Sequence, residues 1–234
     1  MKQNNSILLS IVIPVLNEAE HIGKLITHLW ENSSQKYAIE IIVVDGGSID
    51  NTVAIATDSG ATVFHSKKGR AKQMNFGARK AKGDILYFLH ADTFPPKHFD
   101  SHILKATNRN YSVGCFRMKF DSTNKILQLS GWMTRINLRI CRGGDQSLFI
   151  TKELFVKSKG FNEGFIIYED NEFIGRMYQM TTFTILPYYV STSARKYKKN
   201  GVLKLQYHFS IIHLKKLFGT SPTRLYEYYK RNIE

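Results

Sequence analysis

Residues 41–48 read IIVVDGGS, an apolar run that ends in an aspartate, two glycines and a serine. Residues 85–92 read ILYFLHAD, a second apolar run that ends in a histidine and an aspartate. Continuous apolar runs of this length are typical of strands buried on both faces of a parallel sheet. Because ligands of open α/β sheets bind beyond the carboxyl ends of the strands, we expect Asp45 and Asp92 to lie on one rim above one crevice. Two carboxylates there indicate an enzyme that handles a cation, most simply a metal ion carrying a phosphorylated substrate.

The composition is that of an ordinary globular protein. The chain has 234 residues, of which 43% are hydrophobic and 22% charged, and this length suits one large α/β domain or two small ones. Cys115 and Cys141 lack the spacing of metal ligands, so we expect a reduced, cytoplasmic protein. Residues 1–6 are polar and the apolar run at 7–16 is short and interrupted, which argues against a signal peptide. No stretch approaches the apolar length that spans a bilayer.

The chain is strongly basic, with a formal net charge of +14. Residues 195–234 hold ten lysines and arginines against Glu227 and Glu234, a net charge of +8. A basic surface favours polyanions such as nucleic acids, anionic lipid headgroups or nucleotide phosphates, and a merely solvated surface is the alternative. The sequence has no zinc-finger spacing, aromatic RNA-binding signature or heptad array, so specific nucleic-acid binding is not expected.

Strand and helix patterns alternate over the first part of the chain. Strands are expected at residues 10–15, 39–44, 61–65 and 85–89, separated by helices at 18–30 (capped by Asn17), 50–60 and 69–81. This alternation predicts an α/β fold with a doubly wound, mostly parallel sheet and helices on both faces.

The later part of the chain is less regular. Its expected elements are helices at 98–109, 125–139, 151–158 and 171–179, strands at 113–120, 146–150 and 182–187, and a helical segment after residue 201. Since no internal repeat or low-complexity linker divides the sequence, we expect residues 1–234 to form a single domain.

Five short motifs follow one another in order, and Glu169-Asp170 lies further downstream. They are IPVLNE at 13–18, VVDGGSIDNT at 43–52, GRAKQMN at 69–75, HAD at 90–92 and GDQ at 144–146. This series resembles the family 2 glycosyltransferases of GT-A fold over roughly residues 8–190. The combination of GRAKQMN, LHADT and GGDQSLFI resembles a bacterial subgroup of small, soluble members. The resemblance implies a nucleotide-sugar-binding half at about 8–115, an acceptor half at about 116–195 and a basic helical tail at 196–234.

The resemblance also implies where the donor binds. In this family the loop after the first strand holds the base and ribose, which assigns Pro14 and Glu18 to substrate binding. Asp45 matches the carboxylate that accepts a hydrogen bond from the base N–H, with a cap on its own loop as the alternative. Asp50 is expected to cap the following helix and is left out of the site. Arg70 lies where a basic loop enters a helix, so it should face an anionic part of the sugar-nucleotide unless the loop is simply a basic surface.

Asp92 matches the last acid of the family's Asp-x-Asp metal motif. The resemblance implies an Mn²⁺ or Mg²⁺ ion there, which would bridge the diphosphate and help the leaving group to depart. His90 stands where the first aspartate of that motif usually is. A neutral imidazole is a poorer ligand than a carboxylate for a hard ion, although Mn²⁺ accepts it. We therefore expect Asp92 to bind the metal, and His90 to be either a ligand or a contact of the ribose or sugar.

The resemblance makes Asp170 the general base that deprotonates the acceptor hydroxyl in a single inverting displacement. Helix capping is the alternative for Asp170, but capping alone does not require the neighbouring Glu169, which we assign to substrate binding. Gly144 and Asp145 should shape the side that receives the sugar and acceptor. Arg195 either neutralises charge on the leaving group or belongs to a solvated basic face.

The tail carries two apolar stripes at helical spacing, one at residues 202, 205, 209 and 212 and the other at residues 207, 211, 214 and 218. A helix packed on the core, or on a second copy in a homodimer, explains them. The alternative is an interfacial helix that brings the enzyme to a lipid-linked acceptor at the inner face of an anionic membrane. His208 and His213 interrupt a clean membrane-binding face, which favours the packed helix.

The resulting prediction is a metal-dependent, inverting glycosyltransferase that moves a sugar from a nucleoside-diphosphate sugar to an acceptor hydroxyl. A nucleotidyltransferase that makes the activated sugar is an alternative on the same fold, but such enzymes favour a glycine-rich, basic loop where residues 16–19 read LNEA. A non-catalytic protein that binds sugar-nucleotides or nucleic acid is a second alternative, and it would not need Asp170.

Overall fold

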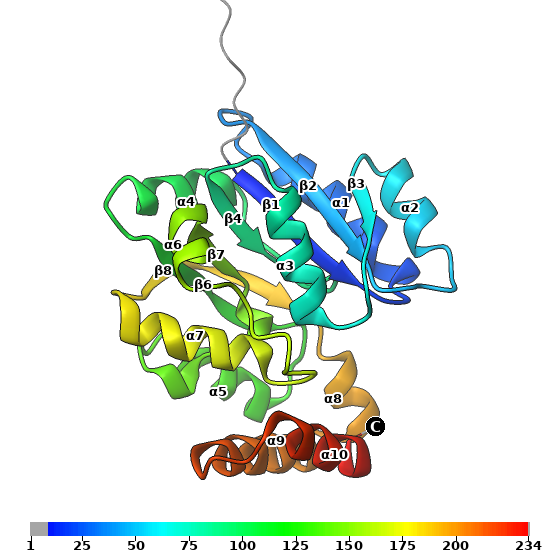
Figure 1. Cartoon of the computed structure of the whole chain (residues 1–234), viewed down its shortest axis with the longest axis vertical. Helices are drawn as coiled ribbons and strands as arrows, with labels where there is room; N and C mark the ends of the chain where they lie inside the picture. Colours follow the sequence, from blue (N-terminus) through cyan, green and yellow to red (C-terminus); the bar gives the residue numbers. More distant parts are fainter. Residues whose placement is uncertain (1–8, 234) are drawn as a thin grey trace, which may run out of the picture.

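The computed structural model of the protein describes residues 9–233 (Figure 1). Residues 1–8, on which part of the argument against a signal peptide rests, and residue 234 lie outside that range. Within it, the strands form one eight-stranded sheet in the order β3-β2-β1-β4-β7-β6-β8-β5. The strands are β1 (Leu9–Val15), β2 (Ile39–Asp45), β3 (Thr62–His65), β4 (Ile85–Phe88), β5 (Thr93–Phe94), β6 (Val113–Phe120), β7 (Leu148–Thr151) and β8 (Thr184–Thr192).

The first four strands form the parallel part of the sheet. β1 pairs in parallel with β2 and β4, and β2 pairs in parallel with β3. β7 runs antiparallel between β4 and β6, whereas β8 is parallel to β6 and antiparallel to β5. The mostly parallel sheet predicted from the sequence is confirmed, and the carboxyl ends of β1, β2 and β4 meet along one edge.

Helices cover both faces of this sheet, as predicted. One face is covered by α1 (Ala19–Asn32) and α4 (Phe99–Thr107). The face toward the viewer in Figure 1 is covered by α3 (Arg70–Lys80), α6 (Lys152–Lys157) and α7 (Glu169–Met180). The short helix α2 (Thr52–Asp58) packs beside α1 and β3. Along β1, Ile11 and Ile13 enter the first core cluster and Val12 the second. Burial on both faces explains why these strands read as continuous apolar runs.

Gln73 fixes the first turn of α3 against the sheet. Its amide Nε2 donates to the carbonyls of Val15 and Val44, each 2.8 Å away, and the side chain is buried. Those carbonyls lie at the carboxyl ends of β1 and β2. Because a buried amide needs its partners, this pair of hydrogen bonds places the N-terminus of α3, with Arg70, beside the strand ends.

The helix predicted over residues 125–139 is shorter than expected. α5 ends at Met133 (Lys125–Met133), and a short turn, η1 (Arg139–Cys141), follows. The buried guanidinium of Arg142 donates to the carbonyls of Thr134 and Ile136, at 2.7 and 2.5 Å. A longer helix would use those carbonyls internally, so the arginine replaces the expected last turns.

The strand predicted at 182–187 continues through a proline to Thr192. In β8, Leu186 pairs with Phe116 and Tyr189 pairs with Arg117, which leaves Pro187 and its neighbour in an irregularity of the ladder. Proline has no N–H to donate, and a bulge removes the need for one.

The structure also differs from the prediction in smaller details. β7 begins at Leu148 because Gln146 belongs to the turn η2 (Gly144–Gln146), and the two-residue β5 was not predicted at all. The expected cap by Asn17 was wrong: Glu18 holds the N-cap position of α1, whereas Asn17 has φ 55° and accepts a hydrogen bond from the N–H of Ile49.

The tail forms a separate layer below the sheet in Figure 1. It consists of α8 (Arg195–Asn200), α9 (Val202–Leu217) and α10 (Pro222–Asn232). Leu205 and Ile212, from the first predicted stripe, are buried in a third core cluster with Phe165 and Ile167, so packing of that stripe is confirmed. None of the helices within residues 9–233 has the length and apolar content needed to cross a bilayer.

Candidate active site

A cleft of about 1220 Å³ opens at the carboxyl edge of the parallel strands, with the tail as one of its walls. Eight of the ten residues predicted for the site line it: Pro14, Glu18, Arg70, His90, Asp92, Asp145, Glu169 and Asp170. Asp45 is not among the lining residues, and Gly144 begins the turn η2 beside Asp145. The folded chain therefore brings together charged groups from its first, middle and last thirds.

His90 lies between two of the predicted carboxylates. Its Nε2 is 3.4 Å from Oδ2 of Asp170, and its Nδ1 is 3.7 Å from Oδ1 of Asp145. Burial favours the neutral form of Asp170, but His90 and the charge of Arg70 together outweigh burial and lower the pKa of Asp170. Burial opposes a charge on His90, and the same contact with Asp170 raises the pKa of the imidazole. Asp170 is therefore held as an ionised carboxylate, the form that accepts a proton.

The start of α7 is held by the tail. Tyr168 occupies the N-cap of α7 with φ 72°, and its hydroxyl lies 3.0 Å from Nδ1 of His213 on α9. This hydrogen bond fixes the residue that precedes Glu169 and Asp170. No sequence pattern predicts this hydrogen bond, because its partners lie 45 positions apart.

Glu169 forms an ion pair with Arg70 across the cleft. Nε of Arg70 is 2.8 Å from Oε1 of Glu169, whose side chain is only 1% exposed. Burial raises the pKa of Glu169 even though Arg70 opposes the rise, and Glu169 in turn raises the pKa of Arg70. Neither carboxylate oxygen accepts a hydrogen bond of regular geometry, so the guanidinium is the main compensation for this buried charge.

Arg70→Met should therefore lower the free energy of unfolding by about 1–3 kcal/mol at neutral pH, because Glu169 then lacks its counter-charge. Arg70 is 43% exposed, so solvent screening keeps the loss below that of a fully buried pair. In urea unfolding, the double variant with Glu169→Gln added should recover most of the lost free energy of unfolding. The pKa of Glu169 is raised in the folded state, so protonation of this carboxyl favours folding. The stability that Arg70→Met loses should therefore become smaller as the pH falls through the folded-state pKa of Glu169. A double variant no more stable than Arg70→Met would contradict this account.

Arg195 connects the tail to two cleft carboxylates. Its Nε is 3.0 Å from Oδ2 of Asp92, and its Nη1 and Nη2 donate to the two oxygens of Glu18 at 2.8 and 2.6 Å. Burial raises the pKa of Asp92, although Arg195 opposes that rise. The sequence left the role of Arg195 open between a leaving-group contact and a solvated face, and the structure puts its guanidinium in the cleft.

The protein's own side chains do not enclose a metal site in the described part of the chain. Among residues 9–233, no group of three or more His, Cys, Asp and Glu side chains is placed to hold an ion. Asp92 faces the cleft and already holds a cationic group, the Arg195 guanidinium, at 3.0 Å.

The carboxylate of Asp45 is directed into its own loop. It accepts hydrogen bonds from the N–H groups of Gly47 and Ser48, at 2.9 and 3.0 Å, and lies 3.3 Å from Nδ1 of His65. Its side chain is 2% exposed. This geometry corresponds to the loop cap that the sequence allowed as the alternative to base binding.

Asp50 also contacts backbone rather than the cleft. It accepts hydrogen bonds from the N–H groups of Thr52 and Ala19, at 3.1 and 3.2 Å. These bonds tie together the first turns of α2 and α1. Asn51 holds the N-cap position of α2, so the expected N-cap role of Asp50 was wrong.

The side of the cleft formed by β6, α5, the turn η1, the loop before α7 and the tail is largely apolar, and the sequence did not identify it. The apolar lining residues there are Met118, Phe120, Met133, Ile140, Phe165, Ile166, Ile167, Phe209, Ile212, Leu214, Leu217, Tyr226 and Tyr229. They come from segments whose proximity depends on tertiary packing. The cleft therefore has one side rich in charges and one suited to an apolar group.

A family model described as Glycosyl transferase family 2 matches residues 10–168. The chain belongs to glycosyl transferase family 2. The match ends before Glu169, so Asp170 and Arg195 lie outside the matched residues.

Two curated relatives show how far the likeness extends in sequence. Glucosyl-3-phosphoglycerate synthase of Petrotoga mobilis is 33% identical over 39% of this chain and 32% of its own length. An uncharacterised glycosyltransferase of Haemophilus influenzae is 28% identical over 79% of this chain and 66% of its own. The chain thus spans about a third of the first relative and about two thirds of the second.

Solved structures show the same fold. S. aureus TarS, crystallised with UDP-GlcNAc, superposes with a TM-score of 0.67 at 20% identity, over 80% of this chain and 58% of that one. Glucosyl-3-phosphoglycerate synthase of Mycobacterium tuberculosis, crystallised with Mn²⁺, UDP and glucosyl-3-phosphoglycerate, gives a TM-score of 0.60 at 16% identity, over 78% and 70%. The predicted GT-A fold is confirmed.

Proposed function

We propose that the protein transfers a sugar from a nucleoside-diphosphate sugar to an acceptor hydroxyl, with inversion at the anomeric carbon. The observation that carries this proposal is one cleft in which an ionised aspartate, Asp170, lies close to the guanidinium of Arg70. A base for the acceptor and cations for the leaving group are the two things that this reaction needs. Membership of the family supports transfer over the nucleotidyltransferase alternative.

The donor would lie on the charged side of the cleft. Pro14, near the end of β1, and Glu18, in the loop after it, line the cleft where the base and ribose would rest. Asp45 would act by holding the loop after β2, since its oxygens already accept hydrogen bonds from that loop. Direct contact with the base N–H would require it to give up one of these bonds.

Two guanidinium groups would stabilise the departing diphosphate. Arg70 is held in place by the buried Glu169, so it is oriented before the donor binds. Arg195 would exchange its contacts with Asp92 and Glu18 for phosphate oxygens, which offer the same bidentate geometry. Both groups would stabilise negative charge as the bond between the anomeric carbon and the phosphate oxygen breaks.

Asp92 fits a divalent ion as a single protein carboxylate, because it faces the cleft and already attracts a cationic group. Mg²⁺ and Mn²⁺ are often bound through one or two carboxylates, with the other ligands supplied by substrate phosphates and water. When bound, such an ion would neutralise charge on the diphosphate. The ion at Asp92 and the guanidinium of Arg195 would therefore compete for the same oxygen.

Asp170 would accept the proton of the acceptor hydroxyl while the acceptor oxygen attacks the anomeric carbon. The new bond forms on the face opposite the departing nucleoside diphosphate, so the configuration inverts. His90 would keep Asp170 ionised and oriented through its contact at 3.4 Å. Asp145, 3.7 Å from the other nitrogen of His90, would contact the sugar or acceptor beside the turn that begins at Gly144.

Thermal unfolding with a panel of UDP-, GDP- and dTDP-sugars tests the proposal. One nucleotide class should raise the unfolding midpoint, because a ligand at about a hundred times its Kd adds roughly 2.7 kcal/mol to stability. Mn²⁺ should enlarge the shift. A folded protein that none of the sugar-nucleotides stabilises would contradict donor binding, and turnover of nucleoside triphosphate with a sugar 1-phosphate would support the nucleotidyltransferase instead.

A further inference from the structure

Helix α9 is apolar on two opposite sides. Its inner side packs into the third core cluster through Leu205 and Ile212. On the opposite side, five residues are each more than half exposed: Leu203, Tyr207, Leu214, Leu217 and Phe218. At about 100° per residue these five lie within one arc of roughly 100°, and we call them the outer α9 face.

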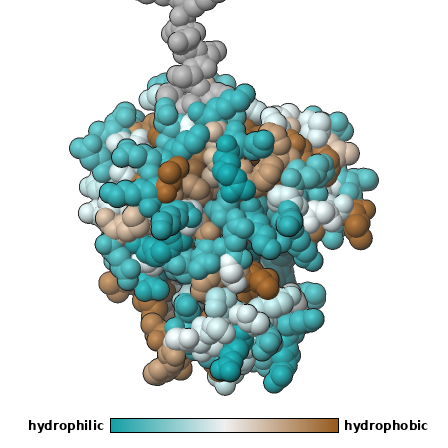
Figure 2. All heavy atoms as spheres, in the orientation of Figure 1, coloured by the Kyte–Doolittle hydropathy of each residue, from teal (hydrophilic) through white to brown (hydrophobic). Residues whose placement is uncertain are grey.

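The outer α9 face is uncovered within residues 9–233. A shallow groove of about 670 Å³ runs along it between α9 and α10, lined by Ile211, Leu214, Phe218 and Tyr228 among others. Figure 2 shows apolar atoms at the lower left of the molecule, in the layer formed by the tail. Contiguous exposed apolar surface of this kind marks a site of interaction with a partner or a membrane.

This face borders the apolar side of the cleft. Leu214 lines both the outer groove and the cleft, and Leu217 lines the cleft as well. Whatever covers the outer α9 face therefore lies next to the apolar side of the cleft.

The charges around the face distinguish between possible partners. Lys204 and Lys215 flank it on the same helix, within a tail of net charge +8. A second copy placed face to face would bring two such sets of lysines together, and their repulsion opposes a homodimer through this surface. Anionic headgroups attract the lysines, whose long stems let the ammonium groups reach the headgroups while apolar neighbours enter the bilayer.

We propose that the outer α9 face docks on an anionic lipid bilayer. Its apolar side chains lie in the boundary between headgroups and acyl chains, and its flanking lysines lie among the headgroups, as in interfacial helices. The mouth of the cleft then lies at the membrane surface, where a lipid-linked acceptor enters it. That acceptor route rests on the proposed transferase function, whereas the docking itself does not.

Co-sedimentation of the full chain with vesicles, without donor or acceptor, tests the docking. Binding to phosphatidylcholine vesicles that contain phosphatidylglycerol should be at least roughly tenfold tighter than binding to pure phosphatidylcholine, and salt should weaken it. Because no sugar-nucleotide is present, failure here would remove the docking and leave the proposed function to its own test.

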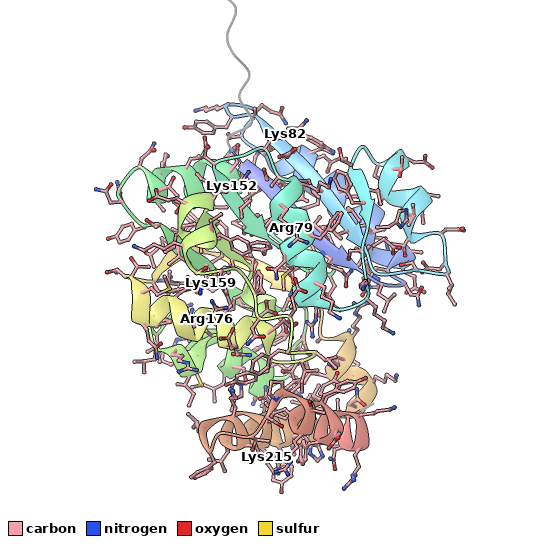
Figure 3. The ribbon with its side chains drawn as sticks, viewed as in Figure 1. Arg79, Lys82, Lys152, Lys159, Arg176 and Lys215 are labelled. Atoms are coloured by element: carbon pink, nitrogen blue, oxygen red, sulfur yellow. The ribbon has the colours of Figure 1, made fainter. Side chains whose placement is uncertain are left out.

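Two pairs of variants separate the apolar and charged contributions. The double variant Leu203→Glu/Phe218→Glu should weaken binding to the anionic vesicles by roughly tenfold or more. Its control, Val156→Glu on the exposed surface of α6, should not weaken binding. Lys215→Glu should weaken vesicle binding to a similar extent. Its control, Lys82→Glu, at the opposite end of the molecule in Figure 3, should have little effect on binding. Unfolding midpoints confirm that each variant is folded.

Three results would overturn the proposal. The first is equal binding of the wild-type chain to both kinds of vesicle. The second is an equal loss of binding in the outer-face variants and their controls. The third is a stable dimer in sedimentation equilibrium that Phe218→Glu dissociates, because a second copy would then cover this face.

Discussion

Replacing Asp92 with alanine should abolish the gain in donor affinity that Mn²⁺ gives the wild-type protein. Asp92 is the carboxylate of the predicted metal motif, and its side chain faces the cleft. Without it the ion would keep only phosphate and water ligands, and the protein would gain nothing from the ion. We expect Mn²⁺ to tighten donor binding to the wild-type chain by roughly tenfold, or about 1.4 kcal/mol. Calorimetric titration of the donor in the presence of Mn²⁺, and again in the presence of a chelator, measures donor affinity with and without the metal.

The guanidinium next to Asp92 provides the matched control. Arg195→Gln removes the internal cation 3.0 Å from Asp92 but leaves the carboxylate, so the gain from Mn²⁺ should persist. Asp92→Ala frees Arg195 from one partner, so metal-free affinity should not fall. An undiminished response to Mn²⁺ in folded Asp92→Ala protein would exclude the metal role of this residue.

The parallel part of the fold could be predicted because its signals are local. Strands buried on both faces read as apolar runs, as in Ile41–Val44, and the helices between them carry their own periodicity. The later strands depend on partners. β8 passes through Pro187 only because the ladder with β6 contains an irregularity there. The chain leaves the helix after Met133, and the carbonyls of Thr134 and Ile136 accept hydrogen bonds from the buried Arg142 instead.

The candidate site was predictable as a set of residue types but not as a set of contacts. Motif order identified Asp92, Arg70 and Asp170, and the structure places them in one cleft. The contact between His90 and Asp170 joins residues eighty positions apart, across the sheet and α7, so no spacing in the sequence encodes it. Similarly, the ion pair between Arg195 and Glu18 spans 177 positions.

The position of Asp45 follows from a local signal in the sequence, the turn chemistry of its own loop. An aspartate followed by two glycines and a serine favours a turn in which the carboxylate accepts backbone N–H groups. Gly47 has φ 98°, a conformation that glycine adopts without strain, and this brings its N–H onto the Asp45 carboxylate. The turn chemistry of the loop therefore accounts for the buried position of Asp45.

Asp170→Asn should reduce kcat for sugar transfer by roughly 10²–10⁴ and leave donor affinity nearly unchanged. Asparagine keeps the size of the side chain and its contact with His90, but it cannot accept the acceptor proton. Hydrolysis of the donor by water should fall less, because water is a small and mobile nucleophile. Initial rates with saturating acceptor, together with donor titrations, separate the two effects.

Glu172→Gln is the matched control for this variant. Glu172 lies two residues further along α7, pairs with Arg176 at 2.8 Å and is not among the lining residues of the cleft. Its replacement changes the charge of the same helix end, so an equal loss of kcat in both variants would indicate an electrostatic effect of the helix rather than base catalysis.

The anomeric configuration of the product is the most direct test of the central claim, that the protein transfers sugar by a single displacement with Asp170 as base. Proton NMR of product formed by the wild-type enzyme from an α-linked sugar-nucleotide should show a β-glycosidic linkage, and Asp170→Asn protein should form that product at most at about a hundredth of the rate. A product with the α configuration of the donor, or near-normal transfer by the variant, would contradict the claim.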